Sequence, residues 1–205
     1  IKLQVVWFKR DLRVEDNEAF YKASLLGPIL PIYIVEPELW QQPDMSHRHY
    51  MFLKDCIQSL NNSLCSLGQP LIIRVGDVVT VLNKLKEQFN FDSLWSHQET
   101  WNNWTYQRDK KVSIWCQKNN ISWHEPTQTG VVRCLKSRDG WAYNWANEMH
   151  RRLISSPKKL DKINIEIQDF PSPDRLGIID DNCPGRQKGG RYAGLMELDS
   201  FLNPE

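Results

Sequence analysis

The 205-residue chain lacks the cysteine patterns that mark disulfide-rich and zinc-binding proteins. Its five cysteines form no C-x-x-C pair and show no zinc-ligand spacing; they are Cys56, Cys65, Cys116, Cys134 and Cys183. An odd and scattered set of this kind is typical of reduced thiols. The sequence therefore predicts a cytoplasmic protein without a disulfide framework.

Long apolar runs and a strong net charge are also missing. No apolar stretch approaches the length of a membrane span, and the chain begins with a strand pattern rather than a signal peptide. We therefore expect no membrane partner. The net charge of +1 argues against a polyanion-binding surface over the whole molecule, but it permits a local basic patch.

Several signatures of catalysis and cofactor binding are absent as well. The first strand-to-helix junction lacks the G-x-G-x-x-G fingerprint of dinucleotide-binding domains, and no H-x-G-H motif occurs. No Ser-His-Asp or thiol–His set is supported by spacing alone. His47 and His49 are separated by one residue, which does not place them on one face of a helix. The sequence thus assigns no catalytic residue and no metal ligand.

What the sequence does contain is a regular alternation of apolar runs and helical patterns up to about residue 125. The runs are short and apolar or β-branched, as strands buried on both faces are; they are Leu3–Phe8, Ile29–Val35, Leu71–Val75, Ser93–Ser96 and Ile121–His124. Sequences with apolar residues at helical spacing lie between these runs. Asp16 and Asn17 supply side-chain acceptors at the first helix start, and Ser46, Asp77 and Asn102 or Asn103 are capping residues for the later helices. This pattern predicts an α/β, doubly wound (Rossmann-like) five-stranded parallel sheet with helices on both faces. Its binding crevice should lie at the carboxyl ends of the strands.

The character of the chain changes after Glu125. A polar stretch is followed by a helical pattern over Trp141–Leu153 and then by residues 155–190, which are rich in Pro, Gly, Asp and Lys. That composition predicts an irregular connector. Gly189 and Gly190 precede a last helical pattern. The basic stretch 133–141 fits either contact with DNA phosphates or a solvated loop docked on another domain.

The run Trp7–Asn17 is the most specific motif. It resembles the W-F-R-x-D-L-R-x-x-D-N signature that opens proteins of the photolyase/cryptochrome family. The turn at residues 33–37, the helix opening at 45–48 and the Gly189-Gly190-x-x-Ala193 segment resemble the same family. The residues also permit a plainer interpretation, in which Asp11 and Arg13 form a bracing Arg–Asp network and Arg10 either joins it or contacts a ligand.

The resemblance implies a pigment pocket. In family members that carry a deazaflavin antenna, the pocket lies around the second strand end, which implies Arg10, Ile34, Glu36, Met45 and Phe52 here. In folate-carrying members a carboxylate and an amide precede the helix after the fourth strand. At that place this chain has Glu99, Trp101 and Asn102, which can enclose a flat ring. The alternatives are core packing for Met45 and Phe52, and a helix cap beside a buried Trp for the loop.

The resemblance also implies a function. It predicts that residues 1–130 form a photolyase-type antenna domain, 131–190 a helix and interdomain connector, and 191–205 the start of a helical FAD-binding domain. The antenna pigment would be deazaflavin, methenyltetrahydrofolate or flavin, and the partners would be the chain's own C-terminal FAD-binding domain and damaged DNA. The implied activity is light-driven repair of pyrimidine dimers by the full-length protein. A cryptochrome photoreceptor and a stand-alone nucleotide-binding domain are the alternatives.

Overall fold

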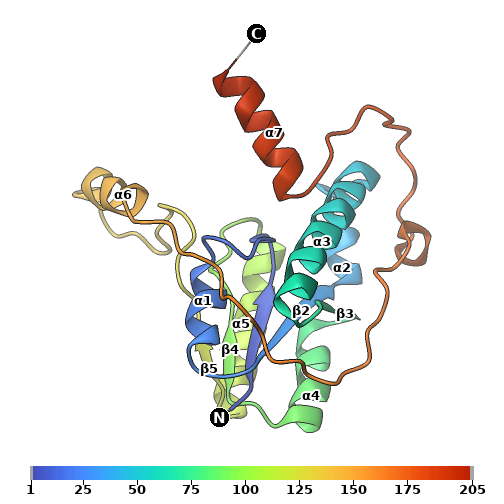
Figure 1. Cartoon of the computed structure of the whole chain (residues 1–205), viewed down its shortest axis with the longest axis vertical. Helices are drawn as coiled ribbons and strands as arrows, with labels where there is room; N and C mark the ends of the chain where they lie inside the picture. Colours follow the sequence, from blue (N-terminus) through green and yellow to red (C-terminus); the bar gives the residue numbers. More distant parts are fainter. Residues whose placement is uncertain (1, 204–205) are drawn as a thin grey trace.

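In the computed structural model, which describes residues 2–203, the core is a parallel sheet of five strands with helices on both faces (Figure 1). The strands are β1 (Gln4–Phe8), β2 (Ile29–Val35), β3 (Ile72–Val75), β4 (Ser93–Trp95) and β5 (Ser122–His124). Their order in the sheet is β3-β2-β1-β4-β5, and all pairs are parallel. The fold predicted from the sequence is confirmed.

The strands form where apolar residues follow one another, because helices cover both faces of the sheet. All residues of β1 and β2 are buried, and Val5 and Val6 of β1 lie in two separate apolar clusters. Successive side chains of a strand point to opposite faces, so these two clusters are the cores above and below the sheet. Each observed strand agrees with its expected range to within a residue at either end.

One face of the sheet is covered by α1 (Glu18–Ser24), α2 (Pro37–Trp40) and α3 (His47–Leu67), and the other by α4 (Val78–Phe89) and α5 (Asn103–Lys118). Three of the expected caps are confirmed, because the side chains of Asn17, Asp77 and Asn102 each accept a backbone N–H at the start of a helix. Ser46 occupies the cap position of α3, but its side chain makes no cap hydrogen bond.

Two helices beyond residue 125 do not cover the sheet. The helices α6 (Trp141–Met149) and α7 (Arg191–Leu202) both stand apart from it (Figure 1). The helix expected over Trp141–Leu153 ends earlier, where His150 forms its C-cap and Arg151 turns to bind Glu18 of α1 (Nη1–Oε2, 2.7 Å).

The connector between α6 and α7 is irregular, as expected, except for the short 3₁₀ helix η1 (Pro173–Leu176). It is nevertheless anchored to the domain. Leu160 and Leu176 are buried in the core, and the backbone N–H of Leu160 donates to Leu67 O (2.7 Å). Among the described residues, no helix is long and apolar enough to cross a membrane.

Candidate functional site

A cavity of about 690 Å³ lies at the carboxyl ends of β1 and β2. The chain runs from β1 outward to β2 and β3 and then returns to β4 on the other side of β1, so the direction of winding reverses at β1. Open parallel sheets bind ligands at such a reversal. The loop before α5, the first half of α3 and the start of α7 complete the wall of the cavity.

Seven of the eight residues predicted as pigment contacts line this cavity: Arg10, Ile34, Glu36, Met45, Phe52, Glu99 and Trp101. Asn102 does not line it. Its Oδ1 accepts from the N–H of Thr105 (3.0 Å), and its Nδ2 donates to Asp44 Oδ2 (3.1 Å). Asn102 therefore caps α5, as the alternative interpretation of this loop expected.

The apolar part of the wall brings together side chains from β2, from α2, from the turn after α2 and from α3; they are Ile34, Leu39, Trp40, Met45, Phe52 and Leu53. Met45 is half-buried and packs against the core, so packing accounts for part of its environment. Phe52 is 41% exposed, so core packing is the wrong interpretation for this residue. The result is a largely apolar slot in which the ring of Phe52 is accessible, which suits a flat ligand.

Arg10 and Trp101 lie together on this wall. The guanidinium carbon of Arg10 is 4.2 Å from the centre of the Trp101 ring, which is a cation–π contact. Both side chains are exposed, and Trp101 retains 39% of its accessible surface. The buried Trp that the alternative expected in this loop is therefore not Trp101.

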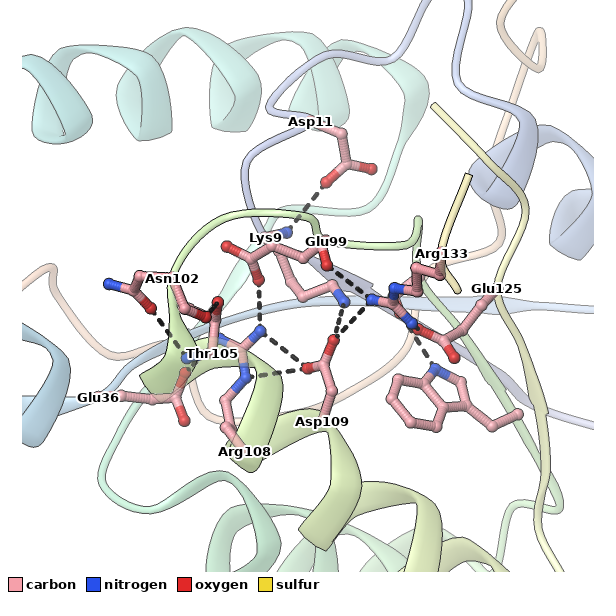
Figure 2. Close-up of polar contacts among 12 residues, drawn as sticks. Lys9, Asp11, Glu36, Glu99, Asn102, Thr105, Arg108, Asp109, Glu125 and Arg133 are labelled. Atoms are coloured by element: carbon pink, nitrogen blue, oxygen red, sulfur yellow. Dashed lines mark hydrogen bonds and ion pairs between the residues drawn. The ribbon is translucent and has the colours of Figure 1, made fainter. Parts of the chain in front are cut away.

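Beside the slot lies a buried group of charged residues centred on Arg108 of α5 (Figure 2). Arg108 Nη1 donates to Glu36 Oε2 (2.9 Å), and Nη2 donates to Glu99 and to Asp109 Oδ1 (2.9 Å). These four side chains are only 5–6% exposed. Because charges buried in a protein must be paired, Arg108 holds the three carboxylates in fixed positions.

The group continues away from the cavity through Asp109, whose Oδ2 lies 3.4 Å from Lys9 Nζ and 3.2 Å from Arg133 Nη2. Arg133 also contacts Glu125. Arg133 is the first residue of the basic stretch that was expected to face DNA or another domain. It forms ion pairs within this domain instead. Lys9 and Arg108 each lie within 5 Å of the Trp7 ring centre, at 4.9 and 4.8 Å, which ties this group to β1.

The excess of carboxylates has a consequence for Glu36. Burial raises the pKa of Glu36 to about 7, despite the attraction of Arg108, and the nearby Glu99 and Asp109 add to the rise. Burial alone would lower the pKa of Arg108, but the three carboxylates outweigh it and the pKa is raised. Arg108 therefore stays charged, while Glu36 is close to half protonated at neutral pH.

Asp11 is a bracing residue, as expected, but its partners are different. Its Oδ2 lies 2.6 Å from Nδ1 of the buried His97 and accepts from Asn17 Nδ2 (3.1 Å). Burial would raise the pKa of Asp11, but the hydrogen bond and charge of His97 lower it overall. The predicted Arg–Asp network is wrong in this respect, because Arg13 binds Asp16 instead.

Sequence reasoning missed Lys9, Arg108, Asp109 and Arg133 as members of the site. One signal was available in α5. Its buried positions are Thr105, Arg108, Asp109, Val112, Trp115 and Cys116, which form one helical stripe. An Arg–Asp pair inside an otherwise apolar stripe indicates buried and therefore paired charges.

A second cluster of polar groups lies at the start of α3. His47 Nδ1 is 3.1 Å from Asp180 Oδ1 and 3.8 Å from Asp181 Oδ1. Arg48 already occupies this cluster, since its Nε donates to Asp181 Oδ2 (2.7 Å) and its backbone N–H to the same oxygen (3.2 Å). We therefore assign it no metal.

Comparison with known proteins finds relatives among photolyases and cryptochromes. The family model for DNA photolyase matches residues 4–160. The chain is 35% identical over 103 residues to cryptochrome DASH, chloroplastic/mitochondrial, of Arabidopsis thaliana, which covers 47% of this chain and 18% of that protein. It is 31% identical over 205 residues to the blue-light photoreceptor PHR2 of A. thaliana, covering 96% of this chain and 39% of that protein.

A solved structure resembles the whole domain. The archaeal photolyase from Sulfolobus tokodaii, described as holding two FAD molecules with the implication of a novel light-harvesting cofactor, superimposes with a TM-score of 0.71 at 21% identity. The match covers 96% of this chain and 46% of that one. At this identity it supports the fold alone. The chain thus spans less than half the length of each of these three proteins.

Proposed function

Because this chain belongs to the DNA photolyase family, we propose that it is the light-collecting domain of a longer protein and that its cavity holds a flat pigment. The observation that carries the proposal is the cavity itself. It combines a volume of about 690 Å³ with an apolar slot, and seven of the eight residues inferred from the motifs line it. Ligand pockets of this size and character hold molecules as large as a deazaflavin, a folate or a flavin.

The residues present fit such a pigment. Ile34, Met45 and Phe52 would contact the faces of its ring system. Trp40, which is 8% exposed, also lines the cavity and would add a third aromatic or apolar side chain beside Met45 and Phe52. Glu36, held through Oε2 by Arg108, would meet the polar edge of the ring. A bound pigment would supply absorption of light, and the protein would fix its position and orientation.

We further propose that residues 1–130 form this antenna domain, 131–190 a connector, and 191–205 the beginning of a helical FAD-binding domain. The apolar side chains of α7 support the last assignment, because Tyr192, Phe201 and Leu202 are 75%, 81% and 63% exposed. Exposed apolar side chains gathered on one helix favour contact with a partner surface. The five cysteines are free, which fits a reducing compartment such as the cytoplasm.

Titration of the 205-residue chain with deazaflavin, methenyltetrahydrofolate and FMN, followed by fluorescence, tests the cavity assignment. Binding should weaken about tenfold or more in Phe52→Ala, because that ring lies on the cavity wall and a buried aromatic contact contributes about 2 kcal/mol. Tyr106→Ala is the matched control, since Tyr106 is a similarly exposed helical aromatic (45%) outside the cavity. If no pigment binds and ATP instead raises the melting temperature, the nucleotide-binding alternative is correct.

For the full-length protein we propose light-driven repair of pyrimidine dimers in DNA. The cryptochrome alternative has its own support, since the 35% identical relative is a cryptochrome DASH. A repair assay on the full-length protein separates the two. Loss of dimers under blue light supports the photolyase, whereas an intact, pigmented protein that repairs no dimer is a cryptochrome.

A further inference from the structure

Arg10 differs from the other cations on the cavity wall. The others are held by carboxylates: Lys9 by Asp109, Arg13 by Asp16, Arg108 by Glu36, Glu99 and Asp109, and Arg191 by Glu15. Within residues 2–203, no carboxylate lies at salt-bridge distance from Arg10. Arg10 is therefore a cation on this wall that a ligand can neutralise.

The contact with Trp101 leaves Arg10 ready to bind an anion. A guanidinium that lies over an indole ring uses its face for that contact and keeps its N–H edge free. This edge is planar and matches the paired oxygens of a phosphate or a carboxylate. The exposure of Arg10 gives such a group direct access from solvent.

Arg10 lies on the same cavity wall as the apolar slot. Arg10 follows directly on β1, and it lines the same cavity as Ile34, Met45 and Phe52. We propose that Arg10, supported by Trp101, binds the anionic tail of the ligand, a phosphate or a carboxylate, while the flat ring lies in the slot. This inference depends on the proposed function of the cavity and adds the class of ligand: a heteroaromatic ring with an anionic tail.

Asp44 places a negative charge on the same cavity wall as Arg10. It lines the cavity, it is exposed, and its Oδ2 accepts from the side chain of Asn102, the residue after Trp101. A carboxylate on this wall repels an anionic tail. Replacing Asp44 should therefore change the preference for anionic ligands in the direction opposite to replacing Arg10.

Two ligand pairs test the proposal on the 205-residue chain: riboflavin with FMN, which adds a phosphate, and folic acid with its triglutamate form, which adds carboxylates. In at least one pair the more anionic member should bind about tenfold more tightly. The pair that shows the preference identifies phosphate or carboxylate as the tail. Arg10→Gln should reduce the ratio of the two affinities to about one, and Asp44→Asn should increase it. Arg138→Gln, at an exposed position outside the cavity, should leave the ratio unchanged.

The outcomes separate this inference from the proposed function. If both members of each pair bind equally, or if Arg10→Gln keeps the ratio of the unchanged chain, the inference is overturned while the cavity assignment stands. If none of the four ligands binds, the inference is overturned, and the cavity assignment then stands or falls with the deazaflavin titration described above. An equal loss of affinity for both members of a pair in Arg10→Gln would give Arg10 a role with the ring alone and would also overturn the inference.

Discussion

Replacing Glu36 with glutamine should remove a specific pH dependence of stability. Glu36 has a pKa of about 7 in the folded chain, against 4.5 for an unperturbed glutamate. Between these two values the folded state holds a proton on Glu36 that the unfolded state has released. By linkage, the free energy of unfolding falls as pH rises through this window. Glutamine cannot titrate, but its side-chain oxygen can still accept from Arg108.

The size of the effect follows from the same two pKa values. A difference of one pKa unit corresponds to about 1.4 kcal/mol, and not all of the shift is realised within a limited pH range. From pH 5.5 to 7.5 the titration of Glu36 should lower the free energy of unfolding by about 2 kcal/mol. The stability of Glu36→Gln should decline less over this range, by about that amount.

Urea unfolding at pH 5.5 and 7.5, with both chains measured side by side, provides the assay. All other titrating groups are common to the two chains, so the difference between their pH dependences isolates Glu36. Glu38→Gln is the matched control, because Glu38 is exposed at the start of α2, two residues away. If the free energy of unfolding depends equally on pH in Glu36→Gln and in the unchanged chain, the pKa of Glu36 is not raised, and burial does not outweigh the attraction of Arg108.

Two further predictions concern the charged group and the attachment of α7. Arg108→Met should lower the free energy of unfolding, measured in urea at pH 7.5, by about 3–5 kcal/mol, because three buried carboxylates lose their common partner. Lys110→Met, on the exposed side of α5, should lower it only slightly. Similar losses in both variants would show that Arg108 does not stabilise this group. Gly189→Ala should detach the start of α7, because a Cβ there would lie 2.2 Å from the carbonyl oxygen of Phe52. Trypsin should then cleave the connector several-fold faster than in Gly185→Ala, where no atom lies within 4 Å of the new Cβ, and equal cleavage rates would contradict the close packing.

The candidate site was only partly predictable. Arg10, Glu36 and Phe52 were inferred from motifs, and the cavity brings them together because the carboxyl ends of β1 and β2 meet at one edge of the sheet. Arg108 was not inferred as a site residue. It is 72 residues from Glu36 in the sequence, and their contact exists only because α5 packs across the sheet beneath the loop of Glu99.

The sequence by itself determined the elements of this protein and their class. Strands buried on both faces appear as short apolar runs, and helix starts appear as capping residues such as Asn17 and Asp77. Both depend on neighbouring residues, so they can be recognised in the sequence. Only the tertiary structure decided which charges pair, which aromatic rings stay exposed and how Glu36 titrates. These properties depend on burial and on partners distant in the sequence, so they cannot be predicted from a local sequence pattern.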